Sequence, residues 1–243
     1  MSVDLTGENR PLAVALGALP TWKAHVVAGR RATAEATFNL LWNKGGVYPY
    51  PTSAQTIKVV STSTADDGAP PGTGALTGYI AGLDANWDEI DETFTYDGTT
   101  EVTLTKQYIR IRKLTVLTAG SGLANVGVIT AYPTGAAASV LAQIDVGDNH
   151  SNQCAISCPR LYRLALYDPA FGWNNTASAR YRVREFGGVF QSRAHYEGLV
   201  MTGGPGMLAV PRAFPAKCDV ELQAFAAAAG VSAEFLAVLV PDA

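Results

Sequence analysis

The chain has 243 residues and a mass of 25.5 kDa, which is long enough to bury one large core or two small ones. Apolar residues make up 48% of it and charged residues 16%, against about 25% charged residues in an average soluble domain. This composition excludes a disordered chain and argues against a coiled coil or a long helical bundle. Because a free monomer usually carries more charge, we expect other chains to cover part of the surface.

The charges and the cysteines exclude further classes. Eighteen basic and 21 acidic residues give a net charge of −3, so no basic footprint for nucleic acid is present. The spacing of Cys154, Cys158 and Cys218 matches neither a disulfide framework nor a zinc ribbon, which predicts reduced structural thiols. The N-terminus lacks a basic signal region and its apolar run, 12–19, is too short to cross a bilayer. We therefore expect a chain that is made in a cytoplasm and binds no membrane.

Residues 1–31 show no sustained alternation of apolar and polar side chains. Two interpretations are open: a flexible terminus, or an extended arm that becomes ordered against a neighbouring subunit. In the second, Trp22, Arg30 and Arg31 are the candidate anchors to a partner. Because no linker longer than a loop follows, the sequence predicts an N-terminal arm over 1–31 and one domain over 32–243.

Short strand-like runs follow at the spacing typical of a sandwich or barrel. Residues 89–96 alternate between apolar and polar side chains, and Asp97-Gly98 after them is a tight hairpin signal. The apolar pattern then moves from even positions, up to Leu104, to odd positions from Ile109 onward. This change of register predicts a β-bulge or a strand break near Lys106-Gln107.

The same patterns predict further strands along most of the chain. The run 220–230 differs, because its side chains are mainly good helix formers and local propensity alone favours a helix there. No repeat of 20 to 50 residues is present, which argues against a solenoid or a β-helix. The other predicted strands lie at 37–42, 57–60, 76–82, 102–104, 109–116, 126–130, 140–145, 161–167, 181–186 and 199–201.

The sequence contains no convincing motif for a catalytic site or a cofactor site. Gly204 to Ala209 matches a dinucleotide-binding pattern, but prolines follow where the phosphate-binding helix should begin. Asp84 to Asp88 resembles the start of a calcium loop, yet Glu89 stands where the loop needs glycine. The three histidines lie far apart with no local motif. We therefore predict a protein that is not an enzyme and has no cofactor or metal.

Three arginines alternate along one predicted strand. Arg180, Arg182 and Arg184 share one face, and Tyr181 and Val183 share the other. One interpretation is a solvated face or a charged guard on an edge strand. The other is a surface that binds an acidic partner, because the planar guanidinium group suits carboxylates.

Several short motifs occur in a fixed order between about residues 57 and 240. Together they resemble a module found in virion structural proteins of tailed bacteriophages, although no single motif is specific. The chain departs from that pattern at Cys218, where a small polar residue is usual, and in its longer N-terminal segment. The motifs are Ser61 to Gly68, Gly72 to Ala75, Gly82 to Ile90, Glu92-Thr93, Gly98 to Thr100, Tyr108 to Ile111, Ala119 to Gly122, Asn125 to Thr130, Phe214 to Leu222 and Val231 to Phe235.

The resemblance implies a jelly-roll-like antiparallel β-sandwich, and a strand instead of a helix over 220–226. It implies a capsid decoration or cement protein on the capsid surface of the virion, made in the host cytoplasm. Its partners would be the major capsid protein and further copies of itself, as a trimer or a dimer. Neither nucleic acid nor a membrane is expected as a partner.

Two other functions fit the same patterns. The chain could be a tail, baseplate or head-fibre component of the virion. It could instead be a glycan-binding receptor protein, in which Trp87, Tyr167 and Trp173 stack on sugars. The absence of β-helix repeats and of an isolated carboxylate pair argues against a glycan-degrading enzyme.

Overall fold

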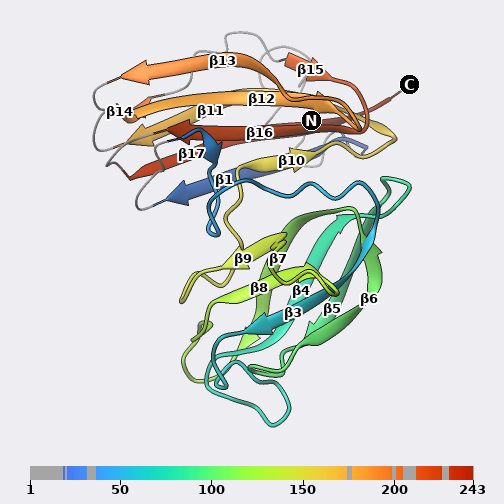
Figure 1. Cartoon of the computed structure of the whole chain (residues 1–243), viewed down its shortest axis with the longest axis vertical. Coiled ribbons are helices and arrows are strands. Elements are labelled where there is room, and N and C mark those ends of the chain that lie inside the picture. Colours follow the sequence, from blue (N-terminus) through green and yellow to red (C-terminus); the bar gives the residue numbers. More distant parts are fainter. Residues whose placement is uncertain are drawn as a thin grey trace, which may run out of the picture.

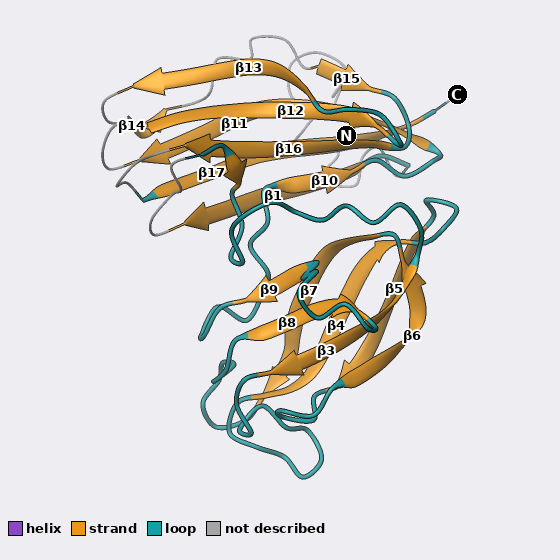
Figure 2. Ribbon diagram, in the orientation of Figure 1, coloured by secondary structure: helices purple, strands orange, loops and turns teal. Residues whose placement is uncertain are grey.

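The computed structural model describes residues 19, 21–31, 37–173, 177–198, 201–204, 212–225 and 230–242. Within these ranges the regular elements are all strands, and their pairings are antiparallel (Figure 2). The predicted all-β class is therefore confirmed.

The strands form four sheets, stacked as two pairs one above the other (Figure 1). We call the upper pair the terminal unit, because it contains the first and the last strands of the chain. The lower pair is the inserted unit, formed by residues 55–144 between them. The sequence predicted one continuous domain over 32–243. The described strands instead group into these two units, although most of their buried apolar side chains belong to one large hydrophobic cluster that extends through both.

The terminal unit has two sheets, each with four successive strands and one short additional strand. One sheet has the order β1 (Lys23–Arg31), β17 (Val231–Pro241), β11 (Tyr162–Trp173) and β14 (Met201–Gly204), and β15 (Arg212–Phe214) also pairs with β11. The other has the order β10 (Ala155–Ser157), β16 (Cys218–Phe225), β12 (Ala177–Glu185) and β13 (Gln191–Gly198), and β2 (Asn39–Leu40) also pairs with β16.

The inserted unit has a four-stranded and a three-stranded sheet. The first has the order β6 (Val102–Tyr108), β3 (Gln55–Ser61), β8 (Ile129–Pro133) and β9 (Ala142–Ile144). The second has the order β5 (Glu89–Thr95), β4 (Ala75–Leu83) and β7 (Arg110–Ala119).

The predicted N-terminal arm over 1–31 is wrong for residues 23–31, which form strand β1 within the terminal unit. Residues 23–31 pair with β17 along the whole of β1, from Lys23 opposite Leu239 to Arg31 opposite Val231. Gly29 allows the close approach of this strand, because a β-carbon there would lie 2.1 Å from the carbonyl oxygen of Leu41. The remainder of the predicted arm, apart from residues 19, 21 and 22, lies outside the described residues.

Strand β16 overrides the local helix propensity of its sequence. Residues 220–225 form a strand, as the family resemblance implied, and the helix prediction is wrong there. β16 lies between β10 and β12, and every residue of it except Phe225 is buried. In this central position, hydrogen bonding along both edges and burial of the side chains stabilise the strand by more than the low strand propensity of its residues destabilises it. Residues 226–229 lie outside the described residues.

The predicted turn at Asp97-Gly98 forms, but it joins two sheets instead of closing a hairpin. The amide of Thr100 donates to the Asp97 carbonyl at 2.8 Å, and Gly98 has a φ of +55°. The strand before the turn, β5, pairs with β4, whereas the strand after it, β6, pairs with β3. The turn therefore carries the chain from one sheet of the inserted unit to the other.

The predicted register break in β6 is confirmed. Gln107 pairs with Thr56 and Thr103 with Lys58, so more residues lie on β6 than on β3 across this interval. The amides of Thr105 and Lys106 each donate to the Glu92 carboxylate at 3.1 Å. Glu92 thus supplies hydrogen-bond acceptors for backbone groups within the bulge.

A buried carboxylate holds the loops of the inserted unit. Asp66 is fully buried and accepts hydrogen bonds from the amides of Ala75, Val126 and Gly127, each at 2.8 Å, and from the Ser61 hydroxyl at 2.6 Å. These donors come from three separate segments of the unit. Asp66 therefore fixes their relative positions by charge-assisted hydrogen bonds.

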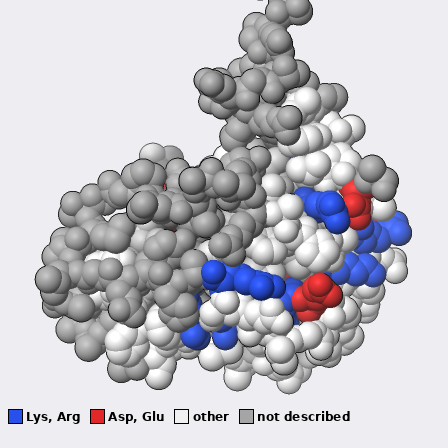
Figure 3. Space-filling view, turned by 90° about the horizontal axis from the view of Figure 1, so that it is seen from above, with Lys and Arg blue, Asp and Glu red and all other residues white. Residues whose placement is uncertain are grey.

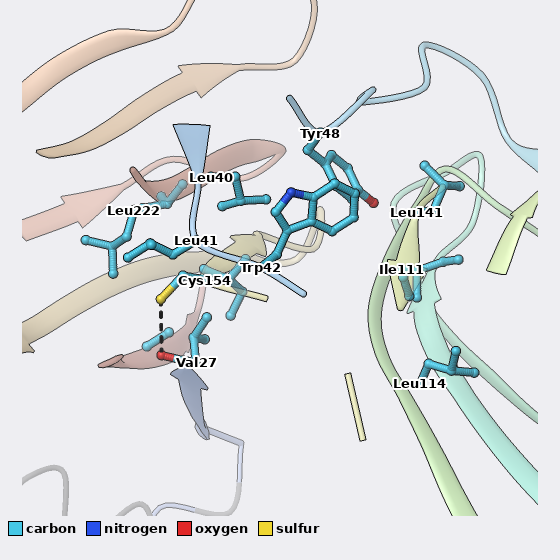
Figure 4. Close-up of a cluster of buried hydrophobic side chains, with 14 of the residues drawn as sticks. Val27, Leu40, Leu41, Trp42, Tyr48, Ile111, Leu114, Leu141, Cys154 and Leu222 are labelled. Carbon is cyan, nitrogen blue, oxygen red and sulfur yellow. Dashed lines mark hydrogen bonds between the residues drawn. The ribbon is translucent and has the colours of Figure 1, made fainter. Parts of the chain in front are cut away.

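Buried side chains continue across the boundary between the units (Figure 4). Trp42 and Tyr48 lie between Leu41 of the terminal unit and Ile111 of the inserted unit. The centres of their two rings are 5.3 Å apart, and the rings are arranged edge to face. Cys154 lies in the same cluster (Figure 4). The three cysteines are buried and unpaired, as predicted for structural thiols, and burial raises the pKa of the Cys154 thiol.

Candidate functional site

The three alternating arginines of β12 form a ladder with polar residues of the adjacent strand β16. We call this set the arginine ladder. Each arginine lies directly opposite its partner in the antiparallel register and donates to it through Nε. The distances are 2.9 Å from Arg180 to Gln223, 3.0 Å from Arg182 to Glu221 and 3.1 Å from Arg184 to Asp219.

Aromatic rings cover the ladder. The guanidinium carbon of Arg180 lies 4.2 Å from the centre of the Phe38 ring, and that of Arg184 lies 4.3 Å from the Tyr50 ring. The guanidinium carbon of Arg182 lies 4.5 Å from the centre of the Phe190 ring. The three arginines are therefore held by cation–π contacts with these rings and by hydrogen bonds to β16, all within this chain. The predicted use of these arginines on a partner remains a hypothesis.

Arg110 connects the ladder to the inserted unit. Its Nε and one terminal nitrogen each donate to the Asp219 carboxylate at 2.8 Å, and both side chains are almost completely buried. The Ser157 hydroxyl donates to the same carboxylate at 2.6 Å, and Tyr50 donates to Glu221 at 2.6 Å. Burial opposes the charged guanidinium, but the hydrogen bonds and charge of Asp219 outweigh it and raise the pKa of Arg110.

The other predicted anchors lie at or beside β1, on the opposite sheet from the ladder. Arg30 forms an ion pair at 3.0 Å with Asp148, in the segment between β9 and β10, and remains 65% exposed. Arg31 lies against Gly45. Trp22 packs beside the small buried cluster of Ala165 and Val238. The structure therefore does not bring the six predicted site residues into one site.

An apolar surface surrounds Trp22. Partly buried apolar side chains from β1 and β17 pack against Ala165 and Val238, and Val26 of β1 is 75% exposed. We call this surface the apolar outer face; it comprises Leu19, Trp22, Ala24, Val26, Leu236 and Val240. Seen from above, the described part of the molecule shows basic side chains, with a few acidic ones beside them, among largely uncharged residues (Figure 3).

The tryptophans proposed to stack on sugars are buried. Trp87 is 1% exposed, under the ring of Phe186 and the guanidinium of Arg110, and Trp173 is 3% exposed. Neither offers a ring face to a sugar, so this part of the receptor hypothesis is wrong. The side chain of Tyr167, the third of these residues, lies outside the described ones.

The calcium-like segment forms a turn. The Asp84 carboxylate accepts hydrogen bonds from the amides of Asn86 at 2.8 Å and Asp88 at 2.9 Å. This is the usual way an aspartate caps its own turn. Over the described ranges, no group of three or more His, Cys, Asp or Glu side chains is placed to hold a metal ion.

A cleft of about 550 Å³ lies between β1 and the inserted unit. Its walls come from β1, from β4 and β7, and from residues 150–156. None of the aspartates and glutamates in the described ranges lines it. The polar lining residues include His25, Tyr79, Arg112, Lys113, His150 and Gln153.

Two of the residues that line the cleft each carry a buried nitrogen without a hydrogen-bond partner among the described residues: Nε2 of His25 and one terminal nitrogen of Arg112. The other terminal nitrogen of Arg112 donates to Glu89 at 2.6 Å, and Lys23 also pairs with Glu89. Burial, with a smaller contribution from the charge of Arg112, lowers the pKa of His25 to about 4. The imidazole is therefore neutral at pH 7.

The sequence patterns missed this cleft because its polar residues come from separated segments with no common motif. His25, Arg112 and His150 are more than 30 residues apart, and only the pairing of the strands brings them together. The partners of the arginine ladder did carry a signal, because Asp219, Glu221 and Gln223 alternate with the same period as the arginines.

Comparison with known proteins gives little further information. No family model and no curated protein matches the chain. Among solved structures, one of the Gx strain of infectious bursal disease virus matches with 9% sequence identity and a TM-score of 0.25. A structure of the Gt strain of the same virus matches with 10% sequence identity and a TM-score of 0.24. Each alignment covers 91% of this chain and 72% of the other. TM-scores below 0.5 do not establish a shared fold. The described residues include no helix suited to crossing a membrane.

Proposed function

We propose that the chain is a virion structural protein of a bacteriophage, and that its terminal unit is a jelly roll. The pairing order of that unit carries the proposal. The first strand, β1, pairs with the last, β17; β2 and β10 share one edge of β16; β11 pairs with β14; and β12 pairs with β13. This nested order, distributed over two sheets, supports the assignment of a jelly roll, an architecture of viral capsid and lectin domains.

The roles of the resemblance motifs support a structural function. Asp66, in the motif from Ser61 to Gly68, holds the loops of the inserted unit. Trp87, in the motif from Gly82 to Ile90, is buried beside Arg110. Both side chains are used in packing and hydrogen bonding, which is what a framework protein requires.

Within the virion, the role we propose is that of a capsid decoration or cement protein. The apolar outer face is the surface we assign to contact with the major capsid protein lattice, because Val26 is 75% exposed and its apolar neighbours on this face are only partly buried. Self-association as a trimer or dimer would place copies on the symmetry axes of the lattice. A protein that binds only the assembled shell stabilises it by about 2.7 kcal/mol when its free concentration is 100 times Kd.

Binding to purified capsids of the virus that encodes the chain tests this role. A buried charge is costly at an apolar interface, so we expect Val26→Glu and Val240→Glu to weaken binding at least tenfold. Val47→Glu is the matched control, because Val47 is 77% exposed and lies outside the apolar outer face. Unchanged capsid binding by both variants of the face would contradict the docking surface.

A tail, baseplate or head-fibre location is the alternative within the virion. It predicts binding to purified tails and not to tailless capsids, so the same assay separates the two locations. A glycan-binding receptor is favoured by one observation, the cleft beside β1. That cleft is not part of the capsid-binding proposal.

A further inference from the structure

We propose that the cleft between β1 and the inserted unit binds an acidic saccharide, with Arg112 pairing with its carboxylate and His25 with one of its hydroxyl groups. The cleft shares Ala24 and Val26 with the apolar outer face, but Arg112, Lys113 and His25 lie outside that face, so variants at these residues test the cleft separately from the capsid role.

The first argument is charge. Arg112 and Lys113 line the cleft, and none of the described aspartates or glutamates lines it. Two carboxylates lie behind the lining: Asp148 accepts from Asn152 at 3.2 Å and pairs with Arg30, and Glu89 pairs with Lys23 and with only one of the two terminal nitrogens of Arg112. The cleft therefore carries an excess of positive charge that a carboxylate would neutralise, and the fork of a guanidinium group suits that geometry.

The second argument is hydrogen bonding. A buried donor or acceptor without a partner is costly, and native proteins rarely keep one. Two residues that line the cleft, His25 and Arg112, each carry one. Neutral His25 can exchange a hydrogen bond with a hydroxyl group, whereas the free guanidinium nitrogen can only donate. A ligand that carries both a carboxylate and hydroxyl groups would satisfy both nitrogens.

The third argument is size. A volume of about 550 Å³ is much larger than a simple anion needs and lies in the range of small-molecule sites, which often form between domains. Uncharged polar side chains of Tyr79, Ser151, Asn152 and Gln153 also line the cleft. Ser151 already accepts from the amide of Leu114 at 3.0 Å and Asn152 already donates to Asp148 at 3.2 Å. The polar groups left over on these side chains can bond to sugar hydroxyl groups, which favours a sugar acid over inorganic anions.

Calorimetric titration of the full chain tests the site. The probes are D-glucuronate, D-glucose and sulfate. Glucuronate and glucose differ only at C6, so their comparison isolates the carboxylate, while sulfate provides an anion without the sugar ring. We expect glucuronate to bind at least tenfold more tightly than either of the other two.

Variants assign the binding to the cleft. We expect Arg112→Gln to weaken glucuronate binding at least tenfold and Lys113→Gln to weaken it about threefold. Lys113 is an exposed residue, so its variant remains informative if Arg112→Gln does not fold. Arg163→Gln is the matched control, because Arg163 is 60% exposed, pairs with Asp242 and does not line the cleft.

Three results would overturn the proposal. The first is equal affinity for glucuronate and glucose, which would remove the role of the carboxylate. The second is equal affinity for glucuronate and sulfate, which would leave a general anion site. The third is full glucuronate binding by Lys113→Gln together with every folded Arg112 variant, which would place the ligand elsewhere.

Discussion

The two units of the molecule are stabilised in different ways. In the inserted unit, paired strands lie within about one hundred residues of each other, and a single carboxylate, Asp66, holds loops of the same unit. In the terminal unit, β1 pairs with β17 across about two hundred residues of sequence, and Asp219 accepts hydrogen bonds from both units. The inserted unit is therefore organised locally, whereas the terminal unit depends on distant segments and on Arg110 from its neighbour.

The largest effect is expected from Asp219→Ala. This change leaves the buried guanidinium of Arg110 without its carboxylate, and breaking a buried ion pair costs about 3–5 kcal/mol. We expect a loss of about 5 kcal/mol in the free energy of unfolding, measured by urea titration. Hydrogen exchange should show the terminal unit opening first. Arg184→Ala, which removes a partly exposed partner of the same carboxylate, should cost about 1 kcal/mol. A loss below 1 kcal/mol for Asp219→Ala would contradict the dependence of the terminal unit on this network.

A smaller effect, confined to the inserted unit, is expected from Asp66→Ala. Three backbone amides lose their acceptor, and each unsatisfied buried donor costs about 1–3 kcal/mol, reduced where water can enter. We expect a loss of about 3–4 kcal/mol, with faster hydrogen exchange in the inserted unit and little change in the terminal unit. Ser61→Ala removes one donor to the same carboxylate and should cost about 1 kcal/mol. Equal loss of protection in both units would show that the units are not separately organised.

The smallest effect is a pH dependence at the junction. The pKa of His25 is about 4 in the folded chain, below the ordinary value of 6.5, so the unfolded chain binds the proton more readily. The contribution of His25 to stability is therefore lost as pH falls from 6.5 to 4 and does not change below that range. The upper bound is about 3 kcal/mol, reduced because the cleft is open to water. His25→Gln should flatten this part of the stability profile, and an unchanged profile would contradict the burial of His25.

Local patterns were enough to predict the all-β class, the bulge in β6 and the alternation of the arginines, because each depends on neighbouring residues. The strand at 220–225 needed the family resemblance, since local propensity favours a helix there and burial between β10 and β12 decides otherwise.

The division into two units, the role of β1 and the cleft could not be predicted. Each depends on pairing between segments more than one hundred residues apart, such as Val27 with Phe235. The apolar and polar residues of β1 also show no clear alternation. One of its buried positions is Gly29, which is needed there because no side chain would fit, and a glycine gives no hydrophobic signal in the sequence.

Cryo-electron microscopy of whole virions tests the central claim most directly. The account predicts density on the icosahedral shell that fits both units, with the apolar outer face toward the major capsid protein. Density confined to the tail, or absent from the particle, would contradict a capsid decoration role.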